Sequence, residues 1–186
     1  MPEGDFTKFR GDFAESDYSF QVIRTPHLPE KAGESVYESN RLSVFKNISE
    51  CWFSAYPVSE ADYFTFACRE GYEKLHLLSN QRFTEHPVFL GLHLPQLLLK
   101  KGVGLLHCSF IEYKGQAILF AGNKQVGKST QAGLWEKYAT ATVLNGDRAG
   151  VFFKDGKAFA GGVPYCGTSK ICINKQLPIK AIVCLS

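Results

Sequence analysis

The chain has 186 residues, of which 45% are hydrophobic, and a formal net charge of +3. This composition predicts one large or two small globular domains, and the absence of a dense Lys/Arg run argues against a nucleic-acid partner. No apolar stretch reaches membrane-spanning length, and the polar, acidic start Met1–Asp5 is typical of neither a signal nor a transit peptide. We therefore expect a cytoplasmic protein without a membrane partner, whose six cysteines, lacking C-x-x-C spacing, are reduced thiols.

Residues 1–101 predict a strand-rich N-terminal module. Tyr18–Ile23 alternates as a strand, and Ser35–Phe45 predicts two strands around a turn. Tyr63–Ala67 and Lys74–Leu78 predict a second hairpin. No catalytic constellation stands out here, so we expect the module to cover a sheet edge, to dimerise or to recognise a partner.

A short helix after Pro95, ending at Lys100–Gly102, predicts the transition into a second domain over residues 102–186. Leu105–Tyr113 and Gln116–Phe120 then predict a hairpin. His107 in its first strand has two interpretations. It is a half-buried strand histidine, or it lies near a bound nucleotide and hydrogen-bonds a phosphate or an attacking group.

The segment Gly122–Ser129 fills the phosphate-loop pattern G-x-x-x-x-G-K-[ST] between an apolar strand and a helix predicted over Lys128–Ala139. Such a loop aims backbone N–H groups and a helix N-terminus at one anion. Lys128 is expected to reach the terminal phosphates and Ser129 to hold Mg²⁺. The alternative is a glycine-containing turn that binds nothing. The predicted nucleotide-binding residues are Gly122, Asn123, Lys124, Gln125, Val126, Gly127, Lys128, Ser129 and Thr130.

The apolar run Ala141–Leu144 predicts a strand that ends in Asn145–Arg148. A carboxylate at a strand end is where phosphate-loop proteins hold magnesium or position an attacking hydroxyl, so Asp147 is the predicted metal-binding and catalytic acid. The alternative is an ordinary Asn-Gly-Asp turn.

The C-terminal part contains a predicted hairpin around Asp155–Gly156, followed by a glycine-rich loop over Gly161–Lys170. This loop is expected to border the substrate site through Thr168, Ser169 and Lys170. The strand predicted over Ile179–Leu185 runs to the chain end, which indicates a shortened domain or a fragment of a longer one.

The order of these features resembles the HPr kinase/phosphorylase family, P-loop proteins related to the phosphoenolpyruvate carboxykinase fold. The resemblance covers roughly residues 105–185 and rests on His107, the loop Gly122–Ser129, the helix after it and the strand-end acid Asp147. It implies an α/β fold, in which a P-loop mixed-sheet domain follows the strand-rich module. It also implies ATP and Mg²⁺ as cofactors and, often, a homo-oligomer.

The resemblance predicts a kinase that transfers the γ-phosphoryl of ATP to a hydroxyl, with a serine of a small protein or peptide as the expected acceptor. Lys128, Asp147 and His107 are the expected catalytic residues. Three differences from the family support an alternative, a non-catalytic nucleotide-binding module that binds a partner. Family members continue well beyond the point where this chain stops. Gly146 stands where relatives carry a first acid, and Gln125 stands where they often carry glycine.

Overall fold

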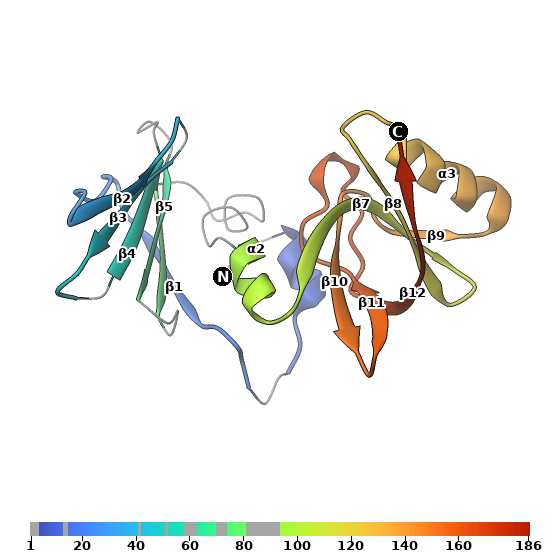
Figure 1. Cartoon of the computed structure of the whole chain (residues 1–186), viewed down its shortest axis with the longest axis horizontal. Coiled ribbons are helices and arrows are strands. Elements are labelled where there is room, and N and C mark those ends of the chain that lie inside the picture. Colours follow the sequence, from blue (N-terminus) through green and yellow to red (C-terminus); the bar gives the residue numbers. More distant parts are fainter. Residues whose placement is uncertain are drawn as a thin grey trace. The chain divides into compact units, whose positions relative to one another are not determined.

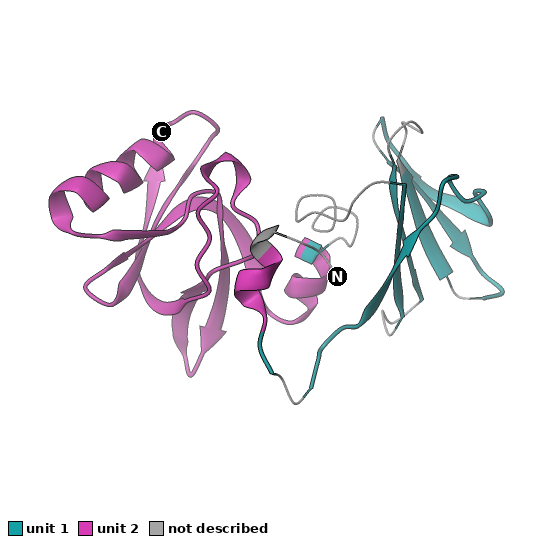
Figure 2. Ribbon diagram, turned by 180° about the vertical axis from the view of Figure 1, so that it is seen from behind, with its two compact units in different colours: residues 1–3, 11–94 teal, residues 4–10, 95–186 magenta. Residues whose placement is uncertain are grey.

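The computed structural model describes residues 4–12, 15–40, 42–50, 52–57, 63–69, 74–80 and 94–186. The described residues divide into two compact units (Figures 1 and 2). The N-terminal unit is formed by residues 11–94, and the C-terminal unit by residues 95–186 together with 4–10. No helix among the described residues is long and apolar enough to cross a membrane.

The N-terminal unit is a six-stranded sheet with strand order β1-β6-β5-β4-β3-β2. Its strands are β1 (Phe20–Arg24), β2 (Glu34–Glu38), β3 (Leu42–Asn47), β4 (Trp52–Pro57), β5 (Phe64–Arg69) and β6 (Leu75–Ser79). Neighbouring strands are antiparallel except β1 and β6. Side chains alternate between the two faces of a strand, and one face is a buried apolar layer that includes Ala55, Phe66, Cys68, Leu75 and Leu77.

The C-terminal unit is built on a second six-stranded sheet, which closes on itself. Its strands are β7 (Gly104–Tyr113), β8 (Gln116–Gly122), β9 (Thr142–Asn145), β10 (Arg148–Lys154), β11 (Lys157–Gly161) and β12 (Gln176–Leu185). Its helices are α2 (Leu94–Lys100) and α3 (Lys128–Ala139), with short 3₁₀ turns η1 (Gly4–Phe9) and η2 (Gly167–Ser169). The order is β10-β11-β12-β8-β7-β9, and an additional pairing of β10 with β7 joins five strands into a ring.

The ring closes because β7 is long enough to pair with two strands along one edge. Its first half pairs with β10, with Arg148 opposite His107, and its second half pairs with β9. The chain therefore bends between β9 and β10 at Gly146–Asp147, and the Cys108 N–H donates to the Asp147 carbonyl across this bend at 3.0 Å. The bend brings Asp147 to the strand that carries His107.

The predicted α/β class is wrong, because the described chain is mainly β-sheet. In the C-terminal unit only β8 and β12 are parallel, and α3 is the single α-helix inserted between sheet strands. After α3 the apolar segments return as antiparallel strands, including the hairpin β10–β11, instead of as further strand-helix repeats. The strand-loop-helix motif was correctly located, but it does not extend into a P-loop mixed sheet of the α/β type.

Helix α3 packs against β7, β8 and β9 (Figure 1). Strand β8 is apolar on both faces, since Leu119 lies in the core within the ring, whereas Ile118 and Phe120 belong to the cluster beneath α3. Trp135 completes this second cluster, with its ring edge-to-face against Tyr113 at 5.2 Å between centroids. The packing fixes the helix that follows the loop between β8 and α3.

The buried side chain of Asn145 holds the bend between β9 and β10 in place. Its Oδ1 accepts hydrogen bonds from the N–H groups of Asp147 and Arg148, both at 2.9 Å. Its Nδ2 donates to the carbonyls of Val163 and Tyr165, at 3.2 and 3.1 Å. Asn145 is 0% exposed, so these four bonds satisfy an amide that water does not reach.

We predict that Asn145→Ala lowers the free energy of unfolding of the C-terminal unit by about 2–5 kcal/mol, because buried backbone groups lose their partners. Urea unfolding followed by Trp135 fluorescence measures the change in a Trp52→Phe background, which removes the other of the two tryptophans. Asn174→Ala, at an exposed position, serves as the control and should change stability by less than about 0.5 kcal/mol. A similar stability for both variants would contradict the proposed role of Asn145.

Candidate functional site

The phosphate-loop segment adopts a backbone conformation that its glycines permit. Gly122 has φ 147°, and a Cβ atom there would lie 2.5 Å from the Leu185 carbonyl oxygen of β12. Gly127 has φ 98° and directly precedes α3, whose N-terminus has no side-chain cap. Gln125 holds a positive φ of 69° without being glycine, a conformation that costs on the order of 1–2 kcal/mol. The loop thus leaves the first N–H groups of α3 available to an anion.

Lys128 is folded back over this loop. Its ammonium donates to the carbonyls of Gly122 at 3.0 Å and Asn123 at 2.8 Å, and the residue is only 8% exposed. A lysine ammonium has three hydrogens, so these two bonds leave one for a ligand oxygen. The charge is therefore held in one place before any ligand arrives.

Asp147 supplies the negative charge of the site, and two side chains lie next to its carboxylate. Arg148 Nε donates to its Oδ2 at 2.9 Å, and His107 Nε2 lies 3.7 Å from its Oδ1. The Arg148 guanidinium also lies over the Tyr165 ring, 4.8 Å from the centroid. The His107 side chain is 53% exposed, so its ring is open to solvent beside the acid.

A pocket of about 620 Å³ brings most of the predicted residues together. It combines the second half of the loop and the start of α3 with the β9–β10 bend. Gly122, Asn123 and Val126 are not among its lining residues. The pocket is lined by His107, Lys124, Gln125, Gly127, Lys128, Ser129, Thr130, Gly146, Asp147, Arg148, Tyr165, Gly167 and Thr168.

Two nearby titratable groups remain protonated at neutral pH. Burial raises the pKa of the Cys108 thiol to about 12, and the negative charge of Asp147 acts in the same direction. Loss of solvent also raises the pKa of the Tyr165 phenol, again with a contribution from Asp147. Cys108 is consequently not a nucleophile under ordinary conditions, whereas Tyr165 keeps a hydroxyl that can donate.

The glycine-rich loop contributes differently from the sequence expectation. Thr168 lines the pocket, but Ser169 and Lys170 do not. The Ser169 hydroxyl instead donates to the Cys166 carbonyl at 2.6 Å. Its side chain fills the space beside Gly146, where an added Cβ atom would collide with it. Ser169 thus leaves no room for a side chain at position 146.

The sequence interpretation did not identify Tyr165 as part of the site, and it assigned no role to the side chain of Arg148. Both are polar residues next to predicted features, Arg148 after Asp147 and Tyr165 within the glycine-rich loop. Their joint position depends on the pairing of β7 with β10 and on the Asn145 bonds to the loop. The arginine directly after the strand-end acid was the one feature of the local sequence that could have indicated a role for Arg148 in the site.

The residues present fit a polyphosphate. Lys124 and Lys128 supply positive charge, and the Ser129 hydroxyl is exposed at the start of α3. Among the described residues no group of three or more His, Cys, Asp or Glu could hold a metal ion. Mg²⁺ nevertheless is commonly held by one or two carboxylates together with substrate phosphates, a role that Ser129 and Asp147 fit.

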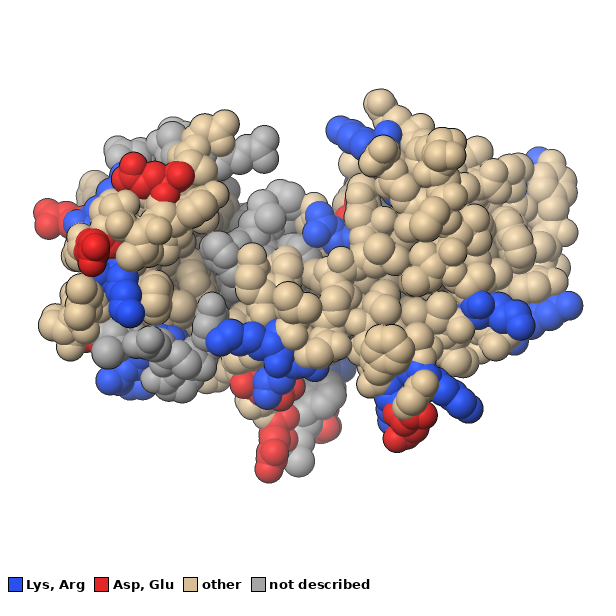
Figure 3. Space-filling model, in the orientation of Figure 1, with Lys and Arg blue, Asp and Glu red and all other residues tan. Residues whose placement is uncertain are grey.

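The wider surface adds no concentrated charge on the side seen in Figure 3, where basic and acidic side chains are scattered.

Comparison of the chain with protein-family models and with curated proteins finds no match.

Proposed function

We propose that the C-terminal unit binds ATP at the phosphate loop and transfers its γ-phosphoryl group to a hydroxyl of a small protein or peptide. The observation that carries this proposal is the meeting of Lys128, Ser129, Asp147 and His107 at one pocket. These residues come from the start of helix α3, from strand β7 and from the bend between β9 and β10, which are separated along the chain. A turn that binds nothing would not need a lysine and an acid in the lining of one cavity.

Each residue has a role that its position supports. The loop N–H groups and Lys128 bind the phosphates, and the Lys128 charge offsets negative charge that develops on the transferred group. A bound Mg²⁺, held by Ser129 and Asp147, would neutralise phosphate charge.

Asp147 also orients the acceptor hydroxyl and takes its proton, and His107 beside it is the second candidate for this proton. Arg148 holds the Asp147 carboxylate in position through its Nε donor.

The second candidate function is a nucleotide-binding module without transfer activity. Two observations favour it. The site has a single carboxylate, already paired with Arg148, and Ser169 occupies the space next to Gly146 where a second acid would be placed. In this case the nucleotide would control binding of a partner.

We predict that Mg-ATP stabilises the protein and that Lys128→Ala removes this effect. Ligand at about 100 times its dissociation constant adds ~2.7 kcal/mol to the free energy of unfolding of a protein that binds it only when folded. Thermal unfolding with and without Mg-ATP measures the difference for each variant, which separates binding from any change in intrinsic stability.

Lys137→Ala is the matched control, because Lys137 is an exposed lysine of the same helix whose ammonium lies over Tyr138. It should keep the full stabilisation. A wild-type protein that Mg-ATP fails to stabilise would contradict both candidate functions.

We predict further that Asp147→Asn slows phosphoryl transfer by about 10²–10⁴-fold, the usual contribution of general acid–base catalysis, while the stabilisation by Mg-ATP largely persists. Transfer of radiolabelled γ-phosphate to a pool of serine-containing peptides measures the rate. Asparagine keeps the size of the side chain but removes its charge. His107→Gln in the same assay tests the second proton acceptor.

Absence of transfer by the wild-type protein, with ATP binding intact, would exclude the kinase and leave the nucleotide-binding module. Equal rates for wild type and Asp147→Asn would remove Asp147 from the chemistry.

A further inference from the structure

Residues 25–32, here called the tethered segment, cross one face of the N-terminal sheet. The Tyr63 hydroxyl lies 2.6 Å from the carbonyl oxygen of Thr25, and the Tyr56 hydroxyl donates to the carbonyl of Glu30 at 2.9 Å. Tyr56 and Tyr63 are 4% and 1% exposed, so both bonds are largely shielded from water. The segment 25–32 is therefore fixed over the face opposite the buried apolar layer.

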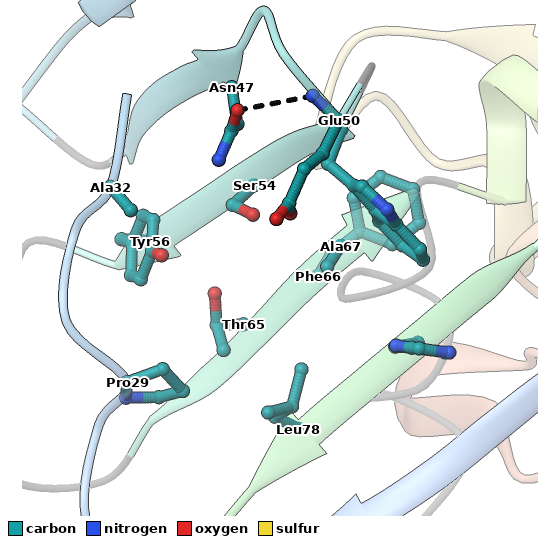
Figure 4. Close-up of a pocket in the computed structure, with 12 residues that line it drawn as sticks. Pro29, Ala32, Asn47, Glu50, Ser54, Tyr56, Thr65, Phe66, Ala67 and Leu78 are labelled. Atoms are coloured by element: carbon teal, nitrogen blue, oxygen red, sulfur yellow. Dashed lines mark hydrogen bonds between the residues drawn. The ribbon is translucent and has the colours of Figure 1, made fainter. Parts of the chain in front are cut away.

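A pocket of about 340 Å³ remains on this face (Figure 4). Pro29 of the tethered segment lies on one side, and Glu50 and Trp52 line another part of the wall. Thr65 and Ser54 contribute hydroxyl groups from β5 and β4. The volume lies within the range of about 300–1,000 Å³ that is typical of sites for small ligands.

Glu50 gives this pocket a negative charge. It is the only lining residue that is formally charged when histidine is neutral. No described Lys, Arg or His forms an ion pair with it. The Asn47 side chain fixes the turn, since its Oδ1 accepts from the Glu50 N–H at 3.3 Å and the Ser49 hydroxyl at 2.9 Å. Figure 4 shows the Glu50 carboxylate pointing toward Ser54.

The aromatic wall adds a second feature that favours a cation. The Trp52 indole packs against the His76 imidazole, with 5.0 Å between centroids and 37° between planes, so its orientation is restrained. Indole has the strongest attraction for cations among aromatic side chains. Elsewhere in the same unit, lysine ammonium groups already lie over rings, Lys46 over Phe53 at 5.1 Å and Lys31 over Phe45 at 5.9 Å.

We propose that this pocket binds an alkylammonium group. The Glu50 carboxylate would offset the charge, the Trp52 ring would face the alkyl part and the charge, and the Ser54 and Thr65 hydroxyls would accept hydrogen bonds from N–H donors. Both a lysine side chain of a partner and a free quaternary amine carry the cationic alkyl group that Glu50 and Trp52 would bind, and only the lysine side chain has N–H groups for the two hydroxyls. The site lies wholly within the N-terminal unit and is independent of phosphate transfer.

The two tryptophans of the chain provide the test, since Trp52 lies in this pocket and Trp135 lies on α3 in the other unit. Proton–nitrogen NMR spectra of the full chain show one indole N–H signal from each, and Trp135→Phe assigns them. Choline represents the free quaternary amine, and Nα-acetyl-lysine amide represents the protein side chain. The neutral carbon isostere of choline, dimethylbutanol, serves as the uncharged probe.

We expect choline, Nα-acetyl-lysine amide or both to shift the Trp52 signal saturably and to leave Trp135 unchanged. A response to one cation alone identifies the source of the ligand. Glu50→Gln should weaken binding about tenfold, a loss of about 1.4 kcal/mol. Glu38→Gln removes the same charge from β2, outside the pocket, and should leave affinity unchanged.

The proposal is overturned if neither cation shifts Trp52, if dimethylbutanol binds as well as choline, or if Glu50→Gln binds as tightly as the wild type. Thermal unfolding of the same protein with and without Mg-ATP addresses the phosphate site separately, so failure at one site is distinguishable from failure at the other.

Discussion

The arrangement of the C-terminal site depends on one buried amide. Asn145 bonds to the bend that carries Asp147 and Arg148 and to the loop that carries Tyr165, using both the acceptor and donor sides of its side chain. Few side chains can do this, because a carboxylate lacks the donors and an aliphatic residue lacks both. The network joins two segments that are about 20 residues apart in sequence, as the 18- and 20-residue separations of its bonds indicate.

Local features were predictable from the sequence where one stretch of chain determines them. The helix over Lys128–Ala139 has the predicted bounds, and the hairpin around Asp155–Gly156 forms as the turn residues require. The apolar run Ala117–Phe120 is a strand buried on both faces, because α3 covers one side and the ring interior lies on the other. His107 and Asp147 were singled out as single residues, and the structure places them 3.7 Å apart.

The fold class was not predictable, because it depends on pairings that no local pattern contains. A glycine-rich loop between a strand and a helix is compatible with several sheet topologies. The pairing of strands that come later in the chain determines which of these topologies forms. Here one edge of β7 pairs with both β9 and β10, and its pairing with β10 closes the ring. The same pairing sets Arg148 opposite His107, so the missing topology also explains why Tyr165 and the role of Arg148 were not foreseen. Strand β4 was not identified, although it occupies the middle of its sheet.

The single acid of the site follows from packing. Ser169 is held by its bond to Cys166, and its side chain fills the space that any side chain at Gly146 would need. A second carboxylate there would require the η2 turn to move, and Gly167 in that turn already packs so closely on Asp147 that a Cβ atom would lie 2.7 Å from its Oδ1. The chain thus fixes one carboxylate tightly instead of presenting two. The proposed phosphoryl transfer is compatible with a single fixed carboxylate, because in that reaction a protein contributes mainly alignment and electrostatic stabilisation.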